Sequence, residues 1–166
     1  MSNLKKILVI AILSAAGAVL SIIESMLPIL TAIPGGKLGI ANIVTIIALY
    51  IMGPTSALAV SVIRTVISSA LYGGFNAFIY SFSGAVFSTL IMIIAKKSLG
   101  KNVSTVGVSV LGAAAHNVAQ VAVAWFFIRT EALWFYLACL LLLSSLFGVC
   151  SGFCAGECIK RLDFKG

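Results

Sequence analysis

Long, uninterrupted apolar runs fill most of this chain and constrain its fold more than any other feature. Of its 166 residues, 61% are hydrophobic and only 9% are charged, whereas about a quarter of the residues of a soluble domain are charged. Too few polar residues remain to cover a water-facing surface, so the chain must use lipid as its solvent. Continuous apolar runs, unlike the alternating segments of a membrane barrel, predict helices. We therefore expect an all-α polytopic membrane protein.

The number of spans follows from the length of the chain. A helix needs about 20 mostly apolar residues to cross a bilayer, so the chain allows about six crossings and leaves no room for a soluble domain. Short connections rich in Gly, Pro, Asn and Ser separate the apolar runs. We predict one transmembrane domain over residues 1–166, a bundle of six helices at about 7–27, 38–52, 55–72, 75–95, 105–128 and 132–158.

The basic residues predict how the chain is oriented, because cytoplasmic loops carry an excess of Lys and Arg. With the N-terminus inside, the outer side holds only Lys37 and Arg129. The inner side holds Lys5, Lys6, Lys96, Lys97, Lys101, Lys160, Arg161 and Lys165. We therefore expect a multi-pass protein of the bacterial cytoplasmic membrane with both termini cytoplasmic. The net charge of +7 then reflects topology and contact with the lipid bilayer, and no nucleic-acid partner is expected.

The stretch "AIPGGKLGIAN", residues 32–42, interrupts the apolar runs and places Lys37 in the break. The span that follows is about 15 residues long, or ~22 Å, which is shorter than the ~30 Å hydrocarbon core. A shortened span interrupted by Gly and Pro indicates a binding site, and a helix N-terminus beside a lysine favours an anion. We predict that this outward-facing loop caps a pocket and holds a carboxylate or phosphate of a small ligand. The alternative is an ordinary extracellular turn whose lysine reaches the lipid headgroups.

Arg64 lies near the middle of the span 55–72. A central arginine disfavours membrane insertion by roughly 2.5–3.5 kcal/mol, so its side chain should face the bundle interior and be paired. The expected partner is Glu24, the acid that lies well inside a span. Arg64 is then either a second anion contact in the pocket or one half of a structural ion pair.

Three polar residues, His116, Asn117 and Gln120, lie within about one turn of the span 105–128. Such side chains either join helices or face a pocket. Because the chain has one histidine, one subunit cannot form a multi-histidine metal site or a bis-histidine haem. We expect neither a metal site nor a cofactor, while the roles of lone ligand and proton carrier stay open for His116. Together with Asn42, the candidate ligand-binding residues from this reasoning are Glu24, Lys37, Arg64, His116, Asn117 and Gln120.

Small residues repeat every four positions in the first and last spans. The repeats are Ala11 with Ala15, Ser14 with Ala18, and Gly148 with Gly152 and Gly156. Such stripes mark close helix–helix contact, within the bundle for the last span and either there or with a partner membrane protein for the first. Cys150, Cys154 and Cys158 repeat in the same way, and we expect them to be small buried residues, with soft-metal binding and acylation of Cys158 as alternatives.

Three blocks of the sequence carry a family resemblance: "PGGKLGIANIVTIIALYIMG", "SVIRTVISSALYGG" and "GVSVLGAAAHNVAQ". They are similar to the Gx transporter family, often labelled heptaprenyl diphosphate synthase component I, and the similarity covers nearly the whole chain. That family in turn resembles the S components of energy-coupling factor transporters. S components are six-helix bundles that capture a vitamin or another small molecule from outside, beneath the first loop. They dock on a transmembrane coupling subunit that carries two ATPases.

The resemblance implies roles for particular residues. In S components an Ala-x-x-x-Ala pattern in the first helix contacts the coupling subunit, and Ala11 and Ala15 match that pattern. It also implies that members of the shared blocks bind the ligand, namely Lys37, Gly39, Asn42, His116, Asn117 and Gln120. The identity of the ligand does not follow from it.

The leading hypothesis is a substrate-binding, S-component-like subunit of a small-molecule uptake transporter. Its ligand would be anionic or polar and would be captured from the outer side. Energy would come from separate ATPases, because the chain has no phosphate-cradling Gly-rich loop ending in Gly-Lys-Ser/Thr. No constellation of catalytic residues is recognisable.

Two alternatives remain. Prenyl-chain elongation needs Mg²⁺ held by clustered carboxylates, but Glu24, Glu131, Glu157 and Asp163 are widely separated. The chain is therefore not expected to be the enzyme, whereas a non-catalytic membrane component that binds a prenyl diphosphate for a soluble partner is compatible with it. Relatives also occur beside genes of flavin-based extracellular electron transfer, so a membrane subunit of a flavin-linked electron-transfer system is the other alternative.

Overall fold

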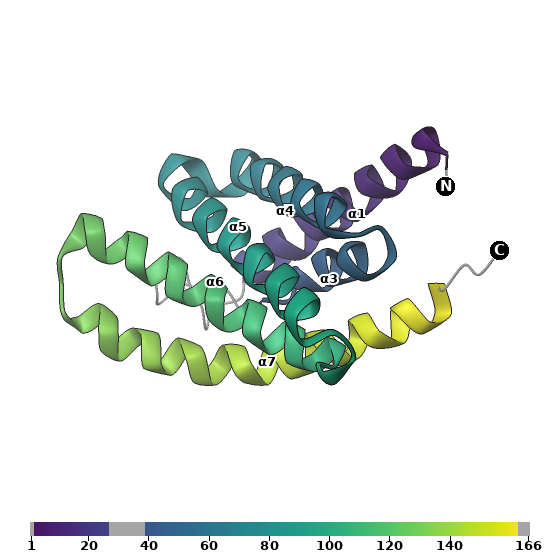
Figure 1. The fold of residues 1–166 in the computed structure, drawn as a ribbon. Helices are drawn as coiled ribbons and strands as arrows, with labels where there is room; N and C mark the ends of the chain where they lie inside the picture. The colour runs from purple at the N-terminus through teal and green to yellow at the C-terminus, as the bar shows by residue number, and fades with distance from the viewer. Residues whose placement is uncertain (1, 27–38, 163–166) are drawn as a thin grey trace.

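A computed structural model describes residues 2–26 and 39–162 of the chain (Figure 1). Within these ranges the fold is all-helical, with six α-helices and no strand. The helices are α1 (Asn3–Ser25), α3 (Asn42–Ile51), α4 (Pro54–Ser68), α5 (Gly74–Leu99), α6 (Thr105–Ile128) and α7 (Ala132–Leu162). A π-helical turn, Ser69–Gly73, joins α4 to α5, and a 3₁₀ turn, Gly100–Asn102, follows α5.

Five of these helices are long and apolar enough to cross a membrane, and α3 is the shorter one. The predicted span 38–52 contains only the 10 residues of α3, or ~15 Å at 1.5 Å per residue. Glycines in the left-handed region lie on both sides of it, Gly39 with φ +87° and Gly53 with φ +92°, and such residues end helices. The described residues thus support a multi-pass membrane protein with five helices long enough to span, and the sixth span stays a prediction.

The short helix α3 lies inside the bundle and contacts α1, α4, α6 and α7. Around it, α1 packs against α4, α4 against α5, α5 against α6, and α6 against α7. The start of α1 and the end of α7 lie at the same end of the bundle, and the turn between α6 and α7 lies at the opposite end (Figure 1). A polar cluster at the start of α3 would therefore be enclosed by helices from both halves of the chain.

Lys96 of α5 closes the C-terminal end of α3. Its Nζ donates a hydrogen bond of 3.0 Å to the carbonyl oxygen of Leu49 and lies 4.1 Å from the centre of the Tyr50 ring. A cation at this position interacts favourably with the negative end of the helix dipole. Pro54 then begins α4 directly after Gly53, where a proline without an N–H is well tolerated.

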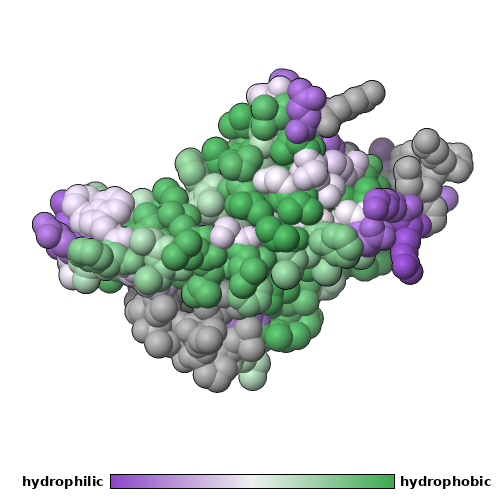
Figure 2. Space-filling view, turned by 90° about the horizontal axis from the view of Figure 1, so that it is seen from below, coloured by the Kyte–Doolittle hydropathy of each residue, from purple (hydrophilic) through white to green (hydrophobic). Residues whose placement is uncertain are grey.

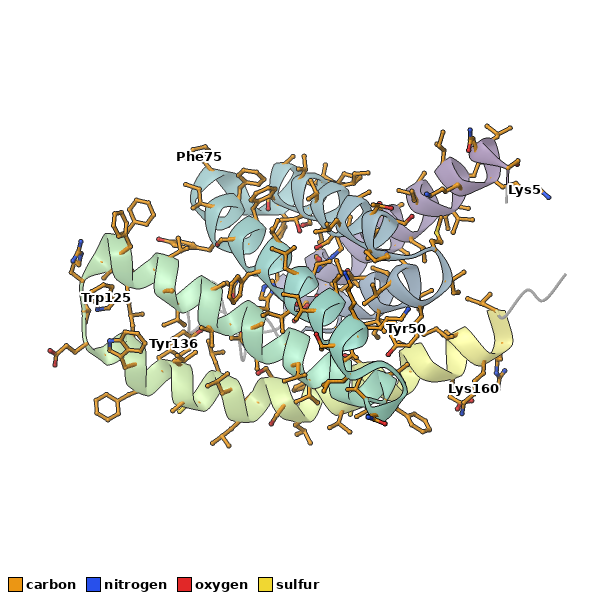
Figure 3. The ribbon with its side chains drawn as sticks, in the orientation of Figure 1. Lys5, Tyr50, Phe75, Trp125, Tyr136 and Lys160 are labelled. Atoms are coloured by element: carbon orange, nitrogen blue, oxygen red, sulfur yellow. The ribbon has the colours of Figure 1, made fainter. Side chains whose placement is uncertain are left out.

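The distribution of polar and apolar side chains is that of a protein in lipid. Large apolar residues are exposed along the helices, including Phe75 at 77%, Phe135 at 81% and Leu142 at 75%. Figure 2 shows this apolar surface over the middle of the molecule, with hydrophilic residues gathered towards its ends. Figure 3 places Lys5 and Lys160 at one end of the bundle and Trp125 at the other. Many of the buried residues, in contrast, carry hydroxyl, amide or charged groups.

The glycine stripe of α7 packs against α6. A side chain at Gly152 would lie 2.5 Å from Val106 Cα, and one at Gly148 would lie 3.0 Å from Val110 Cα. These glycines therefore allow the two backbones to approach closely.

The expectation that the cysteines are buried is wrong, because Cys150, Cys154 and Cys158 are all exposed. Each cysteine follows a glycine of the stripe by two positions, or about 200° around the helix. The cysteines therefore lie on the side of α7 that faces away from α6.

Candidate functional site

The candidate site is built around Arg64, whose side chain is only 3% exposed between α1 and α4. The two helices can enclose an arginine because Gly17 of α1 faces it. A Cβ atom at Gly17 would lie 2.8 Å from Arg64 Cδ and 2.6 Å from Val44 Cγ2. Gly17 thus provides the space that the guanidinium stem occupies.

The guanidinium group is hydrogen-bonded to side chains from two other helices. Its Nη1 donates to the hydroxyl of Ser21 on α1 at 3.2 Å, and its Nη2 donates to Oδ1 of Asn42, the first residue of α3, at 2.9 Å. Both partners are at most 2% exposed. The charge that membrane insertion disfavours is therefore paired in the bundle interior, as the sequence predicts.

Glu24 supplies a negative charge to the same cluster. It is 1% exposed, and its Oε1 accepts a hydrogen bond of 2.6 Å from the backbone N–H of Gly39. The Glu24 and Arg64 charges also attract one another. The backbone at Gly39, with φ +87°, thus brings the entry to α3 against the C-terminal end of α1.

The polar face of α6 adjoins this cluster. A Cβ atom at Gly39 would lie 3.5 Å from Ala113 Cβ, and Ala113 is one turn before His116 and Asn117 on α6. His116, Asn117 and Gln120 are each at most 4% exposed. On their other side is Gly84 of α5, where a Cβ atom would lie 2.9 Å from both the His116 ring and Gln120 Cγ.

The two groups differ in how their hydrogen bonds are satisfied. Among the described residues, the amide groups of Asn117 and Gln120 have no hydrogen-bond partner at either their nitrogen or their oxygen atoms. Near Arg64, the unpaired buried atoms include two donors, Arg64 Nε and Asn42 Nδ2. Spare donors beside a positive charge are suited to the oxygen atoms of a carboxylate or phosphate.

The structure brings together Glu24, Gly39, Asn42 and Arg64, and it places the three polar residues of α6 on the adjoining helix. Lys37 lies outside the described residues. Ala11 and Ala15, predicted to contact a partner, are both exposed on α1. The repeat of Ser14 and Ala18 is on the opposite, buried side of the same helix.

Three residues with clear roles in the cluster were missed by sequence reasoning: Gly17, Ser21 and Gly84. Ser21 precedes Glu24 by three positions, so the helical period places the two on one face and could have found it. The two glycines carried no comparable signal, because the glycine spacing alone does not show which side chain fills the space opposite.

The described residues contain no group of three or more His, Cys, Asp or Glu side chains that could hold a metal ion. The cluster contains Arg64 and Glu24, hydroxyl and amide groups, and one backbone N–H. Such groups can bind and orient a polar molecule through charge and hydrogen bonds.

A family model described as "Heptaprenyl diphosphate synthase component I" matches residues 13–158. This range includes every candidate ligand-binding residue from Glu24 to Gln120. No curated protein and no solved structure matches the chain.

Proposed function

The chain belongs to the heptaprenyl diphosphate synthase component I family, and we propose that it is an integral membrane subunit that binds a small anionic or polar ligand for uptake. The observation that carries the proposal is the buried Arg64 at the start of α3, hydrogen-bonded to Ser21 and Asn42 and still holding a free Nε donor among the described residues. A cluster held by three helices in the bundle interior is pre-organised for an oxyanion.

The direction of uptake rests on the distribution of charge. Lys5 and Lys160 lie at one end of the bundle (Figure 3). The last turns of α5 and α7 carry Lys96 and Lys97, and Lys160 and Arg161, respectively. The positive-inside rule assigns this end to the cytoplasm. The ligand then enters from the opposite side and binds at Arg64, Asn42 and the polar face of α6.

Energy for uptake would come from a transmembrane coupling subunit with ATPases. The exposed positions Ala11 and Ala15 on α1 are the proposed contact with that subunit. The chain itself would catalyse no reaction.

A second function is supported by the description of the matched family. The chain could serve heptaprenyl diphosphate synthesis as a non-catalytic membrane component, with the same Arg64 cluster holding the diphosphate. Acidic side chains for the Mg²⁺ that prenyl transfer requires are widely spaced in the sequence, so the transfer step would belong to a soluble partner.

Native mass spectrometry of the protein taken from its own membrane tests both proposals. We expect a bound small molecule on the wild-type protein that is lost from Arg64→Met and weakened in Arg64→Lys, because lysine keeps the charge but not the planar fork. Arg129→Met removes an exposed arginine that follows the C-terminal end of α6, and this variant should retain the bound molecule. A ligand with the mass of a prenyl diphosphate would favour the second function. A ligand that stays bound to Arg64→Met would refute the site.

A further inference from the structure

A small pocket lies between α5, α6 and α7, apart from the helices that hold Arg64. Tyr80 of α5, Gln120 of α6, and Leu133, Tyr136 and Leu140 of α7 line it. Its free space suits about one water-sized group. Gln120 is about 12 Å from the end of α6 at Ile128, where the turn to α7 follows (Figure 1).

The polar atoms of this pocket lack partners. Within the part of the chain that the structure describes, Gln120 Nε2, Gln120 Oε1 and the Tyr136 hydroxyl are all buried and form no hydrogen bond. Gln120 as a residue is 4% exposed. Roughly nine in ten buried polar groups in proteins are hydrogen-bonded, so three unpaired atoms in one pocket indicate that a polar group from another molecule is held there.

The chemistry of the lining residues defines that group. The Gln120 amide offers both donors and an acceptor, and the Tyr136 hydroxyl can act as either. None of the lining side chains is charged, so the pocket does not favour an ion. The space suits one hydroxyl group, which can donate to Gln120 Oε1 and accept from Gln120 Nε2 or Tyr136.

The rim of the pocket indicates what kind of molecule the hydroxyl group belongs to. Tyr80, Leu133 and Tyr136 are each partly exposed, so the pocket is not sealed. Leu133, Leu140 and the two aromatic rings provide apolar contacts beside the polar atoms. The next residues along α7, Trp134 and Phe135, are 51% and 81% exposed on the apolar outer surface.

We propose that this pocket binds the hydroxyl group of a small uncharged amphiphile, an alcohol that reaches it from the membrane. The hydroxyl lies between Gln120 and Tyr136, and the apolar body lies at the rim against Leu133 and Tyr80. This pocket shares Gln120 with the polar face of α6, but its other lining residues lie apart from Arg64.

The two tryptophans of the chain provide a direct measurement. Trp125 and Trp134 have ring centres 6.2 Å apart, and each follows a pocket-lining residue in the sequence. The probe is 2,2,2-tribromoethanol, whose bromine atoms quench tryptophan fluorescence at short range. The matched control compound is 1,1,1-tribromoethane, which lacks the hydroxyl group.

We expect saturable quenching of the wild-type protein by tribromoethanol and only linear quenching by tribromoethane. Gln120→Leu should raise the Kd for tribromoethanol about tenfold, because a hydrogen-bonded group is lost. Tyr136→Phe removes a single oxygen atom and should weaken binding several-fold, while Tyr72→Phe, at a 54% exposed tyrosine outside the pocket, should not change it.

Two results would overturn the proposal. One is equal, linear quenching by the alcohol and its deoxy analogue, which would leave water as the occupant. The other is an unchanged Kd in both Gln120→Leu and Tyr136→Phe. Thermal unfolding of each variant in the same detergent shows whether it is folded. If Gln120→Leu is not folded, the Kd of Tyr136→Phe decides the test.

Discussion

The two halves of the bundle bury polar side chains in opposite ways. In the half formed by α1, α3 and α4, Arg64 is hydrogen-bonded to Ser21 and Asn42, and Glu24 is hydrogen-bonded to Gly39. On α6, Asn117 and Gln120 are just as deeply buried, but their amide groups have no partners among the described residues. The first group is therefore satisfied in large part by other protein groups, whereas the buried amides of the second lower the stability of the fold as long as they have no partner.

The largest effect should come from breaking the paired group. Arg64→Met leaves the buried Glu24 charge without its attraction to arginine, and removal of one member of a buried pair costs about 3–5 kcal/mol. Thermal or denaturant unfolding in detergent measures it, with Arg129→Met as the exposed control. Adding Glu24→Gln to Arg64→Met should restore part of the loss, and strictly additive effects would show that the two residues do not interact.

Gly17→Val tests whether close approach of α1 and α4 is what keeps Arg64 in place. The added atoms would meet Arg64 Cδ and Val44 Cγ2 at under 3 Å, and such overpacking destabilises by about 1–3 kcal/mol. The matched control is Ala16→Val on the exposed side of the same helix. If both variants unfold at the same temperature, α1 does not clamp Arg64.

Asn117→Leu should change stability in the opposite direction. The residue is fully buried, and replacing an unpaired amide by an apolar side chain of similar size removes a penalty of about 1–3 kcal/mol. The ligand-free Asn117→Leu protein should therefore be more stable than the wild type. Asn42→Leu should be less stable, because it removes the oxygen that accepts a hydrogen bond from Arg64. A loss of stability in both variants would erase the distinction between the two halves.

The smallest effect on stability should come from the C-terminal end of α3. Lys96→Met removes the hydrogen bond to the Leu49 carbonyl and the contact with Tyr50, together worth about 0.5–1.5 kcal/mol. Lys97→Met, at the exposed neighbour, should have little effect. Equal unfolding temperatures for the two variants would mean that Lys96 does not anchor the paired half.

The sequence alone predicted the parts of the fold in which a wrong arrangement would cost much free energy, such as an unpaired charge in lipid. A charged group in lipid must be buried and paired, so Arg64 was expected to face inward and to interact with Glu24. The helix Thr105–Ile128 coincides with the predicted span 105–128, and in the structure the Ser104 side chain caps its start. The shortness of α3 followed in direction from the glycines on either side, although its length was overestimated.

Other parts could not be predicted, because small residues give the same signal whichever side of a helix they are on. The α7 cysteines and glycines share one spacing, yet only the glycines face α6. Ser21 shares a helix face with Glu24, but that spacing does not show that its hydroxyl accepts from Arg64. The space opposite Gly84, which His116 and Gln120 fill, depends on the packing of α5 against α6.

The shortness of α3 has an electrical consequence for the proposed anion site. In the proposed orientation Lys96 is near the cytoplasmic surface, and the first residue of α3 is then ~15 Å away, about half the thickness of the hydrocarbon core. An anion that arrives at Asn42 from the opposite surface therefore crosses about half of the transmembrane voltage. At 100 mV this corresponds to about 1 kcal/mol per elementary charge. The interior-negative polarity of a respiring cell would oppose occupancy, and collapsing that voltage should tighten it.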